Sequence, residues 1–307
     1  MTGLIEKIGD AINAGVDGRR AETRLAPVTP RLSFDIDFAS LAAQGFYSPA
    51  DRASRLSLEL RAVKRALLRR TGLRNANGDP RIARKAGRQR NLVLVTSTRP
   101  GEGKTFCAVN LALSLACEED VSVLLVDADL PRPKVRALFG LPESPGLADR
   151  LLDPSLAVGP LVHEARQARL AIFPEGRQTA KSAELLASAE AQRLFTELST
   201  GAAGRIVIID APPVLAAPDA AILARHVDEV VFVVEANATP GTGVGAALDE
   251  LLETNPNVSL LLNRCLVGES GSYYGSYGDY DRLDPADRSG GRGAVRKSGR
   301  EETICPS

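Results

Sequence analysis

The sequence predicts an α/β fold in which a mostly parallel sheet carries helices on both faces. The first observation is that continuous apolar segments alternate with segments of helical pattern between residues 91 and 265. Strands buried on both faces read as unbroken apolar runs, so this alternation is typical of a parallel sheet. The second observation is a glycine-rich turn, "PGEGKT", between the first such strand and the first helix. Together they predict a P-loop NTPase-like domain.

The first 90 residues precede this pattern and are expected to form extensions. Apolar residues at helical spacing predict a short amphipathic helix over 3–14, and three prolines indicate that 15–50 is mostly linker. A basic amphipathic helix is predicted over 53–70, followed by an exposed loop. The expected organisation is an N-terminal helix and linker (1–50), a basic helix and loop (51–90), the P-loop domain (91–265) and a flexible tail (266–307).

The domain itself divides into strands and helices at the changes of pattern. Helices are expected after the glycine-rich turn and over 181–200, 218–226 and 241–254. Strands are expected in six apolar runs, namely "NLVLVTS", "VSVLLVDAD", "LAIFPEG", "GRIVIIDAPP", "DEVVFVVEA" and "NVSLLLNRC". After residue 265 the pattern stops, and the Gly-, Ser-, Arg- and Asp-rich tail is expected to be disordered.

The segment "TSTRPGEGKTF" (residues 96–106, the P-loop below) predicts a phosphate site. A glycine-rich turn lets backbone N–H groups converge on phosphate oxygens, and the following helix turns its positive end to the same anion. Lys104 is expected to reach the β- and γ-phosphates, and the Thr105 hydroxyl to hold Mg²⁺. Thr98 stands where the strict motif has its first glycine.

Three carboxylates end predicted strands. Asp127 and Asp129 follow "SVLLV", and Asp210 follows "RIVII". The carboxyl ends of parallel strands share one edge with the P-loop, so these side chains are expected to meet there. Phosphoryl transfer with a metal ion needs such groups to hold Mg²⁺ and to orient a nucleophile.

Composition excludes several other classes. Lys+Arg and Asp+Glu both number 38, so no net charge directs the chain to nucleic acid or a membrane surface. The four cysteines lack zinc spacing and fit a reduced cytoplasmic protein. No apolar run in the sequence approaches the length that a membrane span requires.

These motifs resemble those of the bacterial tyrosine kinases of exopolysaccharide loci. "PGEGKT", "LLVDADLPRP" and "IVIIDAPP" are similar to their Walker A, A′ and B motifs, and "YYGSYGDY" to their C-terminal tyrosine cluster. The likeness covers roughly residues 50–282 and is nearest to the autokinases of exosortase-associated loci. The sequence departs from the family's A′ motif at Pro131, which takes the usual arginine position and is followed by Arg132.

The resemblance implies an ATP- and Mg²⁺-dependent autokinase that controls polysaccharide synthesis or export. Asn263 would contact adenine, and Glu59, Arg61 and Arg65 would support a homo-oligomer that phosphorylates itself in trans. A membrane activator of the chain-length-regulator type would recruit the chain to the inner membrane face, and a tyrosine phosphatase would reverse the reaction. No nucleic-acid partner is expected. The implied site comprises catalytic Lys104, Asp127, Asp129 and Arg132, nucleotide contacts from Pro100, Gly101, Glu102, Gly103, Lys104, Thr105, Phe106 and Asn263, and metal contacts from Thr105, Asp127 and Asp210.

Four of the five tyrosines are the expected phosphoacceptors: Tyr273, Tyr274, Tyr277 and Tyr280. A phenol has a pKa near 10 and is a poor nucleophile at neutral pH, so it needs a carboxylate base and a metal-bound phosphate. Asp127 is expected near metal and phenol with Asp129 assisting, and Asp210 is expected to hold Mg²⁺ through water. A low-complexity adhesive tail is the alternative interpretation of this cluster.

Two other functions fit the same motifs. An ATPase switch of the ParA/MinD type shares the fold, but carries an early P-loop lysine where this chain has Arg99. A non-catalytic nucleotide-sensing adaptor would bind ATP without consuming it. The tail tyrosines favour the kinase over the first, and Lys104, Thr105, Asp127 and Asp210 favour it over the second.

Overall fold

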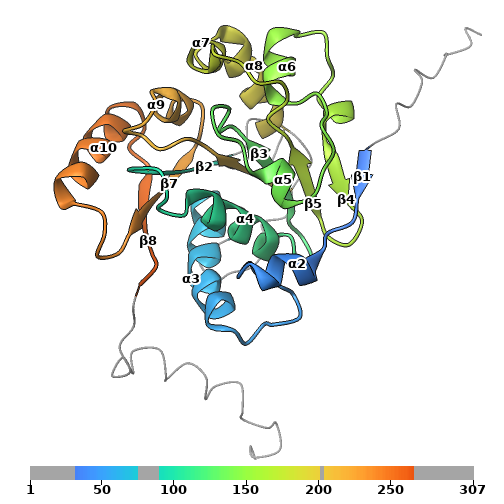
Figure 1. Cartoon of the computed structure of the whole chain (residues 1–307), viewed down its shortest axis with the longest axis vertical. Helices are drawn as coiled ribbons and strands as arrows, with labels where there is room; N and C mark the ends of the chain where they lie inside the picture. Colours follow the sequence, from blue (N-terminus) through green and yellow to red (C-terminus); the bar gives the residue numbers. More distant parts are fainter. Residues whose placement is uncertain (1–31, 75–89, 201–203, 266–307) are drawn as a thin grey trace, which may run out of the picture. The chain divides into compact units, whose positions relative to one another are not determined.

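The computed structural model describes residues 32–74, 90–200 and 204–265, and these form one α/β unit around an eight-stranded sheet (Figure 1). The strand order is β1-β4-β5-β3-β6-β2-β7-β8, and every neighbouring pair is parallel except β4 with β5. The predicted α/β class is thereby confirmed. The strands are β1 (Leu32–Phe34), β2 (Leu92–Ser97), β3 (Ser122–Asp127), β4 (His163–Ala165), β5 (Leu170–Phe173), β6 (Arg205–Asp210), β7 (Glu229–Glu235) and β8 (Val258–Asn263).

Two hydrophobic clusters cover the two faces of the sheet. Alternate residues of a strand point to opposite faces, so Val93 and Val95 of β2 enter one cluster while Leu92 and Leu94 enter the other. Helices α3 and α4 contribute to the first cluster, and α6, α8, α9 and α10 to the second. The helices are α2 (Phe38–Ala43), α3 (Arg55–Arg70), α4 (Lys104–Leu115), α5 (Val135–Leu138), α6 (Leu147–Leu152), α7 (Ser182–Leu186), α8 (Ala189–Ser199), α9 (Asp219–Ala224) and α10 (Gly241–Thr254), with a 3₁₀ turn at Gly159–Leu161.

The segment 32–50 is not a linker, contrary to the sequence-based expectation. It forms edge strand β1, which pairs with β4, and helix α2, which Asp37 caps through a bond from the Ser40 amide. Its buried side chains enter the first cluster because they pack against α4 and the sheet. They are Phe34, Ile36, Leu41 and Tyr47.

The basic helix predicted over 53–70 is α3, and its two faces have different roles. Ser54 caps it, and Leu60, Leu67 and Leu68 are buried. The Lys64 ammonium lies 2.7 Å from the Glu118 carboxylate just after α4, which fixes α3 against α4. Glu59, Arg61 and Arg65 are exposed, so the expected oligomer contact stays a prediction.

The remaining differences are local. The helix expected over 181–200 is two helices, because α7 ends at Leu186 and the Ser188 side chain caps the start of α8. Within the described residues, no helix is long and apolar enough to cross a bilayer. The helix expected over 3–14, residues 75–89 of the loop expected over 71–90, and the tail over 266–307 lie outside the described residues.

Candidate active site

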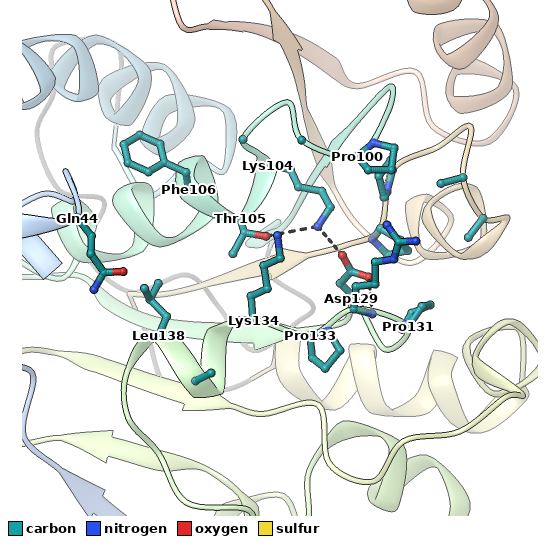
Figure 2. A pocket seen from close by; sticks show the side chains of 18 of the residues that line it. Gln44, Pro100, Lys104, Thr105, Phe106, Asp129, Pro131, Pro133, Lys134 and Leu138 are labelled. Atoms are coloured by element: carbon teal, nitrogen blue, oxygen red, sulfur yellow. Dashed lines mark hydrogen bonds and ion pairs between the residues drawn. The ribbon is translucent and has the colours of Figure 1, made fainter. Parts of the chain in front are cut away.

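A cavity of about 820 Å³ lies at the carboxyl edge of the central strands. Five segments line it: the P-loop with the start of α4, the A′ loop (residues 128–134) with α5, the turn after β6, the stretch after α2, and Arg264 after β8. In open α/β sheets, ligands bind at this edge. Figure 2 shows the A′ loop and the P-loop on opposite sides of the cavity.

The P-loop backbone depends on two glycines in the left-handed region. Gly101 has a φ of 95° and Gly103 a φ of 93°, values that other residues rarely adopt. Gly103 is the N-cap of α4, so the helix begins at Lys104 directly beside the cavity. Its first amides and its positive end therefore face the space where a phosphate would lie.

The ammonium of Lys104 lies among the strand-end carboxylates. It is 2.5 Å from the Asp129 carboxylate and 3.8 Å from that of Asp210, and it contacts the Thr105 hydroxyl at 3.4 Å (Figure 2). Burial alone would lower the pKa of Lys104, but Asp210, Asp129 and Asp127 outweigh burial and raise it. The lysine therefore keeps its positive charge.

Asp127 organises the A′ loop. One of its carboxylate oxygens accepts hydrogen bonds from the Lys134 and Val135 amides at 3.0 and 2.9 Å, and the other accepts from the Asp129 amide at 3.2 Å. Its side chain is fully buried and does not line the cavity. Burial and nearby Asp210 raise the pKa of Asp127, while the Val135 and Lys134 amides oppose that rise.

Asp210 has the carboxylate best suited to a cation. It is fully buried, and within the described residues neither of its oxygens has a hydrogen-bond partner of good geometry, although the Thr105 hydroxyl lies close enough to lower its pKa. Burial raises its pKa, and the Lys104 charge opposes this. Mg²⁺ prefers oxygen ligands and keeps part of its coordination sphere for water and phosphate. The Asp210 carboxylate and the Thr105 hydroxyl are therefore suitable protein ligands for this ion. No cluster of three His, Cys, Asp or Glu side chains that could hold a metal without substrate occurs in the described part of the chain.

Glu102 stabilises the P-loop from within. Its buried carboxylate accepts bonds from the amides of Thr98 and Arg99 at 2.7 and 3.1 Å, and from the Thr239 hydroxyl at 2.6 Å. The carboxylate thereby ties the loop to the turn that precedes α10. A nucleotide contact through this side chain, expected from sequence, gains no support because its oxygens are occupied.

Asn263 lies behind the P-loop at the end of β8. Its side-chain amide donates to the Glu102 carbonyl at 2.9 Å. The residue does not line the cavity, although the next residue, Arg264, does. The adenine contact of Asn263 therefore stays a prediction. Arg99, at the place of the ParA/MinD lysine, donates to the Ala238 carbonyl at 3.2 Å.

The other predicted residues that the structure describes line the cavity, together with several residues that were not predicted. Pro100, Phe106 and Arg132 were predicted and lie on the wall, while the four tail tyrosines fall outside the described residues. Lys134 stands next to the A′ motif, and Pro212 and Pro213 directly follow Asp210, so proximity to a motif could have indicated them. Gln44 and Phe46 carried no such signal, because they belong to no recognisable pattern. Residues missed on the wall include Gln44, Phe46, Lys134, Pro212, Pro213 and Arg264.

Comparison with known proteins identifies the family. No protein-family model matches the chain. The tyrosine-protein kinase YwqD of Bacillus subtilis is 35% identical over 197 residues, which are 64% of this chain and 80% of that protein. The chain is a member of the bacterial tyrosine kinases. CpsD of Streptococcus agalactiae, also a tyrosine-protein kinase, is 28% identical over 65% of this chain and 85% of its own length.

Solved structures agree with this membership. The kinase domain of VpsO is 30% identical to this kinase over 69% of the chain and all of that domain, with a TM-score of 0.55. The BceF tyrosine kinase domain is 25% identical over 83% of the chain and 96% of that domain, with a TM-score of 0.56. The kinase thus shares both sequence and fold with characterised domains of its family.

Proposed function

We propose that this kinase is an ATP- and Mg²⁺-dependent autokinase that phosphorylates Tyr273, Tyr274, Tyr277 and Tyr280 in its own C-terminal segment. The position of Lys104 carries the proposal. A charged lysine at the start of α4 lies against the carboxylates of Asp129 and Asp210 beside a cavity of nucleotide size. Such a site binds phosphate and also holds the acidic groups that a phosphoryl transfer needs.

The position of each residue indicates its role in the proposed phosphoryl transfer. On ATP binding, the P-loop amides and Lys104 bind the β- and γ-phosphates. The Lys104 ammonium then leaves the Asp129 carboxylate and pairs with phosphate. Released Asp129, which lines the cavity, can accept the phenol proton as the phenol oxygen bonds to the γ-phosphorus and the bond from that phosphorus to the β-phosphate oxygen breaks, which releases ADP. This geometry supports Asp129 rather than Asp127 as the base, because the oxygens of Asp127 accept backbone amides.

Mg²⁺ would be held by Thr105 and Asp210, with Asp127 behind them, and would supply positive charge to the transferred phosphate. Arg132 lines the cavity and is exposed, and its amide donates to an Asp129 oxygen at 3.2 Å. It can therefore add positive charge at the open side of the site.

The resemblance supports a wider role in exopolysaccharide synthesis or export. In that role the kinase works as a homo-oligomer at the inner membrane face. Its partners are a membrane activator of the chain-length-regulator type and a tyrosine phosphatase. These proposals rest on the motifs and on family membership.

Mass spectrometry of the full chain after incubation with Mg-ATP tests the activity. We expect phosphate on residues 273–280 in the parent and in Lys181→Ala, an exposed lysine outside the cavity, and none in Lys104→Ala. Addition of EDTA should abolish the modification. ATP hydrolysis that depends on Lys104, with no phosphotyrosine even when the candidate membrane activator is present, would contradict the kinase proposal and favour the ATPase switch.

A further inference from the structure

The side chain of Lys134 lies in the active-site cavity, although it belongs to none of the motifs considered above. It is the last residue of the A′ loop and lines the same cavity as Lys104 and Thr105. Figure 2 shows its side chain extending from the A′ loop toward Thr105 and Lys104. The P-loop and Lys134 therefore approach the phosphate space from opposite sides.

The backbone of Lys134 is held firmly. Its amide donates to the buried Asp127 carboxylate at 3.0 Å, next to the Val135 amide at 2.9 Å. Asp127 ends β3 in the middle of the sheet, so the start of the Lys134 side chain has a fixed position relative to the P-loop. The backbone therefore needs no ordering when a ligand binds, and only the side-chain rotamers are fixed at that point.

The Lys134 ammonium is available for a ligand. Among residues 32–74, 90–200 and 204–265, no carboxylate lies within ion-pair distance of it. Lys104, in contrast, is already shared between Asp129 and Asp210. The positive charge of Lys134 reaches the centre of the site nonetheless, because it lowers the pKa of Asp210 against the larger effect of burial.

The charges of the site favour a further cation. Asp129 and Asp210 place two carboxylates beside the ammonium of Lys104. Mg-ATP brings a further net charge of about −2, so Lys104 does not balance the occupied site, and Lys134 would add to the charge that Arg132 supplies at the open side. A cation opposite the P-loop would lie nearest the outermost phosphate, because the P-loop amides enclose the inner ones.

We propose that Lys134 binds the γ-phosphate of ATP and stabilises its charge during transfer, which would make it a further catalytic residue. The inference rests on the proposed function, since it assumes that ATP occupies this cavity. It predicts discrimination between two nucleotides: Lys134 should contribute to binding of the triphosphate and very little to binding of the diphosphate.

Calorimetric titration of the full chain with Mg-AMP-PNP and with Mg-ADP tests the proposal. For Lys134→Gln we expect the Kd of Mg-AMP-PNP to rise about tenfold and that of Mg-ADP to change less than twofold. Lys134→Arg should restore most of the triphosphate affinity, and Lys181→Gln should match the parent. Equal melting temperatures would show that the A′ loop is intact, as expected because the substitution keeps the Lys134 amide.

Two results would overturn the proposal: unchanged affinity for both nucleotides, or an equal loss for both. The binding readout separates this inference from the kinase activity. A parent chain that binds Mg-AMP-PNP but transfers no phosphate would contradict the proposed autokinase, while the comparison of the two nucleotides would still decide the role of Lys134.

Discussion

At the scale of single residues, the two P-loop glycines with positive φ are under different constraints. A side chain at Gly101 would meet open space, whereas a Cβ on Gly103 would overlap the side-chain amide of Asn263. Gly101 is therefore needed only for its backbone conformation. Gly103 is needed for its conformation and also for the close approach of β8 to the P-loop.

This difference predicts unequal costs of two identical substitutions. Gly101→Ala should lower the free energy of unfolding by about 1–2 kcal/mol, because alanine is strained at positive φ. Gly103→Ala adds the overlap with Asn263 and should cost more. Urea denaturation of both variants measures this. Equal costs would contradict the proposed role of the β8 contact.

The site residues show which parts of the site the sequence could predict. Lys104, Thr105, Asp129 and Asp210 were found because a short glycine-rich turn and two apolar strands fix their positions locally. The hydrogen bond between the Glu102 carboxylate and Thr239 could not be predicted, because the two residues are 137 positions apart in the sequence. A sequence pattern contains no information about such a distant hydrogen bond.

At the scale of elements, long apolar strands were predictable and short ones were not. Strands β2, β3 and β6 are six-residue, nearly all-buried runs, which have few other interpretations. Strands β1 and β4 have three residues each and lie at one edge of the sheet. These short strands form because they pair with strands that are distant in the sequence. A local pattern does not reveal such pairing, so residues 32–50 were expected to be linker.

Helix α6 is held to the turn after β5 by Asp149. This buried carboxylate accepts bonds from the Gly146 and Arg177 amides at 2.9 and 3.0 Å, and from the Arg177 guanidinium at 2.5 Å. Burial alone would raise the pKa of Asp149, but Arg177 and these amides outweigh burial and lower it. The stabilisation is therefore present above the unfolded-state pKa of about 4 and is lost as the pH falls through the lower folded-state pKa.

Asp149→Asn should accordingly lower the free energy of unfolding at pH 7 by about 1–3 kcal/mol. The difference from the parent should narrow as the pH falls below about 4, because the parent then becomes protonated as well. Denaturant titrations at several pH values test this. Asp35→Asn, which removes an exposed pair with Arg166, is the control and should cost less than about 1 kcal/mol. A difference that stays constant with pH would contradict the role of the charge.

At the scale of the whole molecule, α3 offers a surface for self-association. One face packs on α4 through Leu60, Leu67 and the Lys64–Glu118 pair, while Glu59 on the other face pairs only with Arg55 in the described part of the chain. Both members of that pair are more than half exposed, so it contributes little to folding. Glu59 is exposed on this face, so it is accessible for a contact with a second copy.

Glu59→Arg should therefore reduce the oligomer mass with little change in melting temperature. The substitution places like charges beside Arg55, and also at the proposed contact with a second copy. Light scattering of the full chain measures the mass, and Glu119→Arg, another exposed acidic position, serves as the control. An unchanged mass for Glu59→Arg would show that α3 does not mediate assembly.

The pairing of β1 with β4 also has a consequence for how the chain folds during synthesis. Ile36 bonds to Gln167 across 131 residues of sequence, and Leu32 lies beside His163. This segment leaves the ribosome well before β4 and Gln167, so it cannot dock until they have emerged. Such distant contacts form late, because the intervening chain must first become ordered. Gln44 and Phe46 directly follow this segment and line the cavity. We therefore expect their side of the cavity to form only after the P-loop has been synthesised.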